Sequence, residues 1–220
     1  MLKYFDKGYN EDLLILSGWG FDPYIFDFER LPFNLIVPQK PLLSKDIFAI
    51  LSSLKKECFV LGWSYGAHIA YDILCANERL LKGLILVGFS LDFHEESVKE
   101  TIKKLKRDKT RTLKEFYLFC FKGQEEDYKI FKRAHEKRCL RFWNNYELIS
   151  ALTYLIKHKV DISKLERFPS VLIINGKKDI FLKNSPLKYK ILKTVELDSG
   201  HLPFLKDKFY EEIYLFKKRY

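Results

Sequence analysis

One serine lies between two glycines in the segment Gly62-Trp63-Ser64-Tyr65-Gly66, which has the pattern G-x-S-x-G. Residues 58–61 before it are apolar and predict a buried strand, and residues 67–74 after it predict a helix. A sharp strand-to-helix turn presents a serine hydroxyl at the top of a sheet, and glycines fit where other chain segments pack closely. Although five residues alone are weak evidence, the pattern in this setting predicts that Ser64 is a nucleophile.

A serine nucleophile requires a base, and the base requires an acid that orients it. On strand–turn–helix nucleophiles the partners follow in the chain order Ser, Asp or Glu, His. Asp179 follows the apolar run 171–176, and His201 follows the short run 194–197, so both are expected at strand carboxyl ends. We therefore expect His201 to take the proton of Ser64 and Asp179 to hold the imidazole.

Each of these two residues also has an ordinary interpretation. A single aspartate in a Gly-Lys-Lys-Asp loop is commonly a turn residue, and a single loop histidine is commonly solvated. The shared chain order, spacing and strand-end position favour catalysis. Asp198 is the alternative acid, but it is too close to His201 in the sequence to be preferred. His68 is expected to be packed or partly exposed, and no role is assigned to the three remaining histidines, His94, His135 and His158.

The oxyanion of an acyl-transfer reaction needs preorganised backbone donors. One donor is expected to be the N–H of Tyr65, directly after the nucleophile. The other is expected in the loop Ser17-Gly18-Trp19-Gly20, which follows the apolar run 13–16. The N–H of Trp19 is the candidate, and its side chain can pack in the core at the same time.

The elements that must position these residues alternate between strand-like and helix-like segments, which predicts an α/β fold with a mostly parallel sheet. Strands are expected at 13–18, 33–37, 58–61, 83–88, 171–176 and 194–197, and helices at 44–56, 67–74 and 204–216. Residues 91–155 lack the strand pattern and are helical by period. We expect one domain over residues 1–220, with 91–155 inserted as a helical lid above the carboxyl ends of the strands.

Length, charge and cysteine content limit the classes of protein to which this chain can belong. The chain has 220 residues, a net charge of +10 and 47% hydrophobic residues, which suits a domain with a sizeable core. The four cysteines, Cys58, Cys75, Cys120 and Cys139, form no CxxC pair, so no metal site or disulfide is expected. No signal peptide, membrane span or nucleic-acid-binding motif is recognised. We expect a cytoplasmic monomer that needs no metal or organic cofactor.

These motifs together resemble the α/β-hydrolase superfamily. Within it, they look most like the pimeloyl-[acyl-carrier protein] methyl ester esterases of biotin synthesis, the BioH and BioG type. The likeness is carried by residues 17–21, 61–66, 176–179 and 200–204, in which a Gly-Trp-Gly loop accompanies a tryptophan before the nucleophile. The resemblance implies an α/β-hydrolase fold and hydrolysis of the methyl ester of pimeloyl-acyl-carrier protein. Two departures weaken the assignment to one subfamily: Ser17-Gly18 stands where many members have His-Gly, and Ala67 stands where a second glycine is frequent.

The insertion is rich in lysine and arginine, and an acyl-carrier protein is strongly acidic, so a basic lid is a suitable docking surface. The resemblance implies that lid arginines contact the carrier protein, and it points to Arg133, Arg138 and Arg141. Phe116 and Trp143 are candidates for lining an acyl channel. The alternatives are a solvated helix surface for the cations and ordinary packing for the aromatic side chains.

Other functions remain open at this point. Other small-ester or thioester hydrolases share the fold, and so does a menaquinone-pathway lyase that eliminates pyruvate with a similar triad. Pocket shape decides among them, and the sequence does not reveal it. A basic binding module that has lost catalysis is a further alternative. The presence of Ser64, Asp179 and His201 argues against it.

Overall fold

The computed structural model describes residues 2–91, 93–182 and 193–220. Within these residues, seven strands form a single sheet in the order β1-β3-β2-β4-β5-β6-β7. Neighbouring strands run parallel, except that β1 is antiparallel to β3. The strands are β1 (Leu2–Phe5), β2 (Asp12–Leu16), β3 (Asn34–Pro38), β4 (Cys58–Trp63), β5 (Leu81–Val87), β6 (Val171–Gly176) and β7 (Lys193–Leu197).

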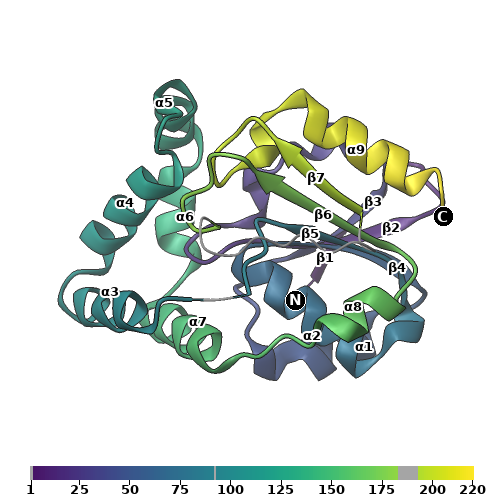
Figure 1. Ribbon diagram of the computed structural model, residues 1–220, viewed down its shortest axis with the longest axis horizontal. Helices are drawn as coiled ribbons and strands as arrows, with labels where there is room; N and C mark the ends of the chain where they lie inside the picture. Colours follow the sequence, from purple (N-terminus) through teal and green to yellow (C-terminus); the bar gives the residue numbers. More distant parts are fainter. Residues whose placement is uncertain (1, 92, 183–192) are drawn as a thin grey trace.

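Helices cover both faces of the sheet. Figure 1 shows α9 on one face and α1, α2 and α8 on the other, with the remaining helices grouped beyond one edge. The helices are α1 (Ile47–Ser53), α2 (Tyr65–Ala76), α3 (Glu95–Arg107), α4 (Lys109–Cys120), α5 (Glu125–Ala134), α6 (Glu136–Phe142), α7 (Asn145–Lys157), α8 (Ile162–Arg167) and α9 (Asp207–Lys217).

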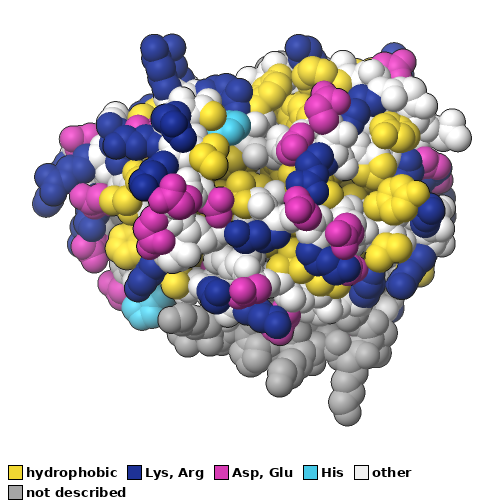
Figure 2. All heavy atoms as spheres, turned by 90° about the horizontal axis from the view of Figure 1, so that it is seen from above, with side chains coloured by type: hydrophobic (Ala, Val, Ile, Leu, Met, Phe, Trp, Pro, Cys, Tyr) yellow, Lys and Arg dark blue, Asp and Glu magenta, His cyan; other side chains and the backbone are white. Residues whose placement is uncertain are grey.

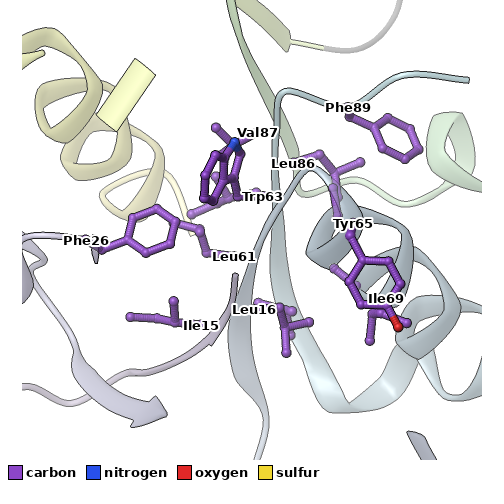
Figure 3. Close-up of a cluster of buried hydrophobic side chains, with 14 of the residues drawn as sticks. Ile15, Leu16, Phe26, Leu61, Trp63, Tyr65, Ile69, Leu86, Val87 and Phe89 are labelled. Carbon is purple, nitrogen blue, oxygen red and sulfur yellow. The ribbon is translucent and has the colours of Figure 1, made fainter. Parts of the chain in front are cut away.

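The central strands are mostly apolar, because helices cover both faces of the sheet. Every residue of β2, β4 and β6 is buried, as expected for parallel strands between two helical layers. Figure 3 shows how the side chains around the end of β4 divide between these layers. Trp63 lies near Phe26 and Val87, whereas Tyr65 lies near Ile69 on α2. The continuous hydrophobic core therefore surrounds the turn that holds Ser64.

The carboxyl ends of the parallel strands meet along one edge of the sheet. In the strand register, Leu16 lies beside Gly62, Trp63 beside Val87, and Val87 beside Ile174. Gly176 in turn pairs with Leu197. The loops after β2, β4, β5, β6 and β7 consequently leave the sheet side by side, which is where sites form in open α/β sheets.

Helices α3 to α8 are inserted between β5 and β6. The predicted boundaries of 91–155 fall close to the first five of these helices, which end at Lys157. Helices α3 and α5 bury one side chain each, Leu105 in α3 and Phe131 in α5. Helices α4 and α7 bury more, including Leu113, Tyr117, Leu148 and Leu152, which belong to the same hydrophobic core as the sheet. Its action as a lid stays a prediction.

Some predicted boundaries were wrong. The helix expected over 44–56 is shorter: a 3₁₀ turn occupies Ser44–Asp46, and α1 ends at Ser53. The Asp46 carboxylate accepts the N–H of Leu43, which closes that first turn. The strand expected over 33–37 runs one residue further, because Pro38 pairs with Leu2 of the unpredicted edge strand β1.

Candidate active site

Ser64 lies in a strained turn directly between β4 and α2. Its φ is 53° and its ψ is −117°, and among the described residues no other non-glycine residue has a positive φ. Such a conformation costs about 1–3 kcal/mol and persists where its surroundings over-determine it. Here the Ser64 N–H donates to the carbonyl of Val87 at 2.8 Å, and the Ser64 carbonyl accepts from Ala67 N–H at 2.9 Å. The backbone on both sides therefore holds the serine in place.

The glycines of the motif are required by close backbone contacts. A Cβ atom placed on Gly66 would lie 2.2 Å from the carbonyl oxygen of Leu16, and one on Gly62 would lie 2.3 Å from the carbonyl oxygen of Gly66. No side chain fits at these distances. The turn can pass so close to β2 because both positions lack a Cβ atom.

His201 and Asp179 form a buried hydrogen-bonded pair. The Nδ1 atom of His201 lies 2.8 Å from Oδ2 of Asp179, and both side chains are almost fully buried. The other carboxylate oxygen of Asp179 accepts the N–H of Phe181 at 2.9 Å, which orients the carboxylate. Hydrogen bonding through Nδ1 leaves Nε2 of His201 as the nitrogen available to a substrate or nucleophile.

Asp198 lies in a different environment from Asp179. Its side chain is exposed and forms an ion pair with Lys178 at 2.7 Å. The hydrogen bond from Lys178 lowers the pKa of Asp198 below its ordinary value. The structure thus places Asp179, rather than the alternative acid, against the imidazole.

The histidine loop is attached to the residue before the nucleophile. The indole N–H of Trp63 donates to the carbonyl of His201 at 2.9 Å, and the two rings lie 5.4 Å apart. Phe181 packs on the other side of the imidazole, with ring centroids 4.6 Å apart. Within the described part of the chain, the Ser64 hydroxyl makes no hydrogen bond, including none to His201. Catalytic hydrogen bonds are often long without substrate and tighten when it binds.

The two candidate oxyanion donors lie on neighbouring strand ends. Tyr65 is the first residue of α2, where a helix leaves its N–H groups without intrahelical partners. Trp19 lies in the loop after β2, which is closed by a hydrogen bond from Phe21 N–H to Gly18 carbonyl at 3.1 Å. Gly18 lies tightly against the Trp63 ring, since an added Cβ would be 3.0 Å from it. The register of β2 and β4 therefore brings both N–H groups to the same edge.

Polar contacts from the insertion hold the loop after β2, and the sequence analysis did not foresee them. The hydroxyl of Tyr117 donates to Gly20 carbonyl at 2.7 Å, and the indole of Trp143 donates to Phe21 carbonyl at 2.8 Å. The indole N–H of Trp19 itself donates to Leu148 carbonyl at 2.9 Å. None of these pairs is close in sequence, so no local pattern could have indicated them.

The two aromatic residues proposed to line an acyl channel occupy different positions. Phe116 is half-buried, with its ring 4.8 Å from Trp19 and 5.9 Å from Phe181, so it lies between the oxyanion loop and the histidine side of the site. Trp143 is almost fully buried and packs against Tyr65 at 5.9 Å. A hollow beside the turn is lined by Ser17, Lys40, Tyr65, Gly66, Phe142 and Trp143, among others. Trp143 therefore lines this hollow, whereas Phe116 is not among its lining residues, and the acyl-channel role of both stays a prediction.

The three arginines proposed to contact a partner also differ. The guanidinium of Arg138 donates to the fully buried carboxylate of Asp22 and lies 4.8 Å from the ring of Tyr24, so its place is set by the fold. Arg133 on α5 and Arg141 on α6 are exposed, and neither forms an ion pair with a described residue. Arg138 therefore attaches the insertion to the core, whereas Arg133 and Arg141 remain available.

The lysines and arginines of α3 and α4 have more acidic partners than the basic run from Lys99 to Lys114 indicates in the sequence. Lys99 pairs with Glu95, Lys104 with Glu100 and Glu115, and Arg111 also with Glu115. The ammonium group of Lys109 instead donates to two backbone carbonyls. Figure 2 shows the dark blue and magenta side chains intermingled over this part of the molecule. Local ion pairs thus neutralise much of the charge expected to attract a partner.

A second cluster of titratable residues joins α2 to α7. His68 is buried, and its Nδ1 lies 3.1 Å from Nδ1 of His158. His158 in turn contacts Asp72 at 2.7 Å, and the hydroxyl of Tyr154 donates to the same carboxylate at 2.6 Å. Burial, together with His158, lowers the pKa of His68 to about 3. His68 is therefore neutral and structural at ordinary pH.

The described residues contain no group of three or more His, Cys, Asp or Glu side chains that would hold a metal ion. All four cysteines are free, and three of them are buried. No helix in the described ranges is both long enough and apolar enough to cross a membrane.

Comparison with known proteins gives both a sequence relative and structural likenesses. No protein-family model matches the sequence. The pimeloyl-[acyl-carrier protein] methyl ester esterase of Wigglesworthia glossinidia brevipalpis is 26% identical over 91% of this chain and 84% of that protein. A thermophilic esterase from Thermogutta terrifontis superposes with a TM-score of 0.80 at 16% identity, covering 99% of this chain and 93% of its own.

A bromoperoxidase from Bacillus anthracis is similar to the same extent, with a TM-score of 0.79 at 16% identity over 99% of this chain and 95% of that one. At such identities the structural likeness establishes the fold and leaves the reaction open. The sheet order, the strand–turn–helix around Ser64 and these near-complete superpositions show that the chain has the α/β-hydrolase fold.

Proposed function

We propose that this protein is a serine carboxylesterase that hydrolyses the methyl ester of pimeloyl-acyl-carrier protein, with Ser64, His201 and Asp179 as its triad. The observation that carries the proposal is the buried pair of His201 and Asp179, 2.8 Å apart, beside a serine held at φ 53°. Three groups far apart in the sequence reach one edge of the sheet, in the chain order Ser, Asp, His that accompanies a nucleophile on a strand–turn–helix. The named relative from Wigglesworthia supports the choice of ester.

The reaction follows from this geometry. Nε2 of His201 takes the proton as Ser64 Oγ bonds to the acyl carbon, and the N–H groups of Trp19 and Tyr65 stabilise the oxyanion. Collapse breaks the bond to the methoxy oxygen, which takes that proton and leaves as methanol. A water molecule then gives a proton to His201 and attacks the acyl carbon. The bond to Ser64 Oγ breaks, Ser64 takes that proton from His201, and the carboxylic acid product is freed. Asp179 holds the imidazole throughout.

A carrier protein is the proposed partner, and it would dock on the insertion. Arg133 and Arg141 support this role because they are exposed and free of ion pairs with the described residues. Phe116 supports the proposed acyl path because it lies between Trp19 and Phe181. The cytoplasmic location and the monomeric state expected from the sequence stay predictions.

A second candidate is hydrolysis of small esters or thioesters that are free of a carrier. The ion pairs of Lys99, Lys104 and Arg111 favour it, because they remove part of the charge that would attract an acidic protein. Both candidates use the same triad and differ in what the insertion recognises.

The test measures methanol and free carboxylate released from pimeloyl-acyl-carrier protein methyl ester, beside a p-nitrophenyl ester. We expect Ser64→Ala to abolish both activities and Asp179→Asn to lower kcat by about 10³–10⁴-fold. Asp198→Asn is the matched control, since its carboxylate pairs with Lys178 away from the imidazole. Cleavage of the p-nitrophenyl ester alone would retain the triad and favour the second candidate. Absence of both activities in the wild type would exclude the esterase.

A further inference from the structure

One residue of the insertion contacts the histidine loop. The side-chain oxygen of Gln124 accepts the N–H of Gly200 at 3.0 Å, and Gly200 directly precedes His201. The contact is close, because a Cβ placed on Gly200 would lie 2.6 Å from that oxygen. Gln124 occupies the N-cap position of α5, yet its side chain makes no capping hydrogen bond to the backbone of that helix. Its acceptor is instead directed to a residue 76 positions away.

Two further contacts place the junction of α4 and α5 over the acid–base pair. The backbone oxygen of Cys120, the last residue of α4, lies 3.7 Å from the position of a Cβ on Gly200. Burial raises the pKa of the Cys120 thiol, and the charge of Asp179 adds to that rise. The end of α4 therefore lies near the carboxylate that orients His201.

The start of α5 is also attached on the other side of the histidine. Asp127 accepts a hydrogen bond from the amide of Gln124 at 3.1 Å and lies 3.5 Å from the ammonium group of Lys206. The start of α5 thus contacts the chain directly before His201 through Gln124, and again at Lys206, after the turn Pro203–Leu205, through Asp127. Figure 1 shows α5 beyond the edge of the sheet from which this loop emerges.

We propose that Gln124 is a positioning residue, through which the insertion sets the alignment of the His201 imidazole toward Ser64. This inference rests on the proposed triad. Hydrogen bonds from separate parts of the chain fix the loop: Asp179 orients the ring, Trp63 holds the His201 carbonyl, Lys178 N–H holds the Ser199 carbonyl, and Gln124 holds the Gly200 N–H. Of these four residues, only Gln124 belongs to the insertion. A movement of α5 would therefore shift the base without disturbing the sheet.

The experiment compares full-length wild type with Gln124→Met, which keeps the length of the side chain and removes the acceptor. We expect kcat on a p-nitrophenyl ester to fall by about 10- to 100-fold, with KM within about twofold, because a small misplacement of a base costs rate rather than binding. The rate of serine labelling by a fluorophosphonate should fall in parallel. Gln124→Asn, whose amide is one methylene too short, should give an intermediate loss.

The rescue variant combines Gln124→Glu, whose carboxylate can accept the same N–H, with Asp127→Asn, which removes the carboxylate that lies 3.1 Å from the Gln124 amide. We expect it to keep kcat within about threefold of wild type. Gln39→Met is the matched control, because the Gln39 amide donates to Val37 carbonyl and Tyr24 hydroxyl instead. Wild-type kcat and labelling rates in Gln124→Met would overturn the proposal, and so would equal losses in the Met and rescue variants with a lowered Tm. If the wild type itself is not labelled, the proposed function fails and this inference fails with it.

Discussion

The sheet and the helical insertion hold the candidate site in different ways. The sheet positions the site through its backbone. Strand register brings the loops together, and Gly66 can lie close to the Leu16 carbonyl because it has no Cβ atom. The insertion acts through single side chains, such as Tyr117 and Gln124, that reach loop backbone atoms. Backbone register resists substitution because many residues share it, whereas each side-chain contact can be removed by one change. Substitutions in the two regions should therefore differ in kind.

The largest difference is expected between two glycines. Gly66→Ala should destabilise the fold by about 3 kcal/mol or more and abolish esterase activity, because the new methyl group meets the Leu16 carbonyl. Gly123, between α4 and α5, has a φ of +76° and open space around it, so Gly123→Ala should cost only about 1 kcal/mol. Urea unfolding monitored by fluorescence measures both. Equal costs would show that steric contact is not what separates the two regions.

A smaller effect is expected from the arginines of the insertion. Arg138→Ala should lower the free energy of unfolding by about 2–3 kcal/mol, because it leaves the Asp22 carboxylate buried without its cation. Arg141→Ala, on the same helix, should change stability by less than about 0.5 kcal/mol. Arg141→Ala should instead lower kcat/KM for the carrier-bound ester. A stable Arg138→Ala protein would contradict the idea that single side chains attach the insertion.

The histidine cluster between α2 and α7 should make stability depend on pH. His68 has a folded pKa of about 3, below the roughly 6.5 of an unfolded histidine, so its contribution is present above pH 6.5 and is lost as the pH falls toward 3. We expect a loss of about 1–2 kcal/mol between pH 6.5 and 5, which His68→Leu should reduce. His158 and Asp72 share the cluster and remain in that variant. The prediction fails if wild type and variant lose stability equally over this range.

The smallest effect is expected for paired cations on the exposed face of the insertion. Lys104 lies 3.7 Å from both Glu100 and Glu115, so Lys104→Ala should change stability by less than about 0.5 kcal/mol and leave carrier-dependent activity unchanged. Arg133→Ala, which removes a cation without an ion-pair partner among the described residues, should weaken that activity and its dependence on salt. Similar effects of both variants would indicate that net charge, rather than particular arginines, attracts the partner.

The sequence predicted the elements of the sheet more closely than the contacts of the helical insertion. The pattern around β4 and α2 and the apolar run of β6 predicted those elements closely, because buried parallel strands leave continuous apolar segments. Within the insertion the period indicated helices, but not which side chains face the core. The basic run from Lys99 to Lys114 contains few acidic residues in the linear sequence. In the structure, Glu115 nevertheless pairs with both Lys104 and Arg111. Helical periodicity gives the neighbours within one helix but not those on the next.

By itself, the sequence determined that an α/β sheet would present Ser64 on a sharp turn, and that Asp179 and His201 would follow strand ends. These features depend on local apolar runs and glycines, which the chain carries in order. Only the tertiary structure decided that Asp179 rather than Asp198 meets the imidazole, that Arg138 pairs with buried Asp22, and that Gln124 holds Gly200. Each of the last two contacts joins the insertion to the core across more than seventy residues, and such pairings are set by packing rather than by local pattern.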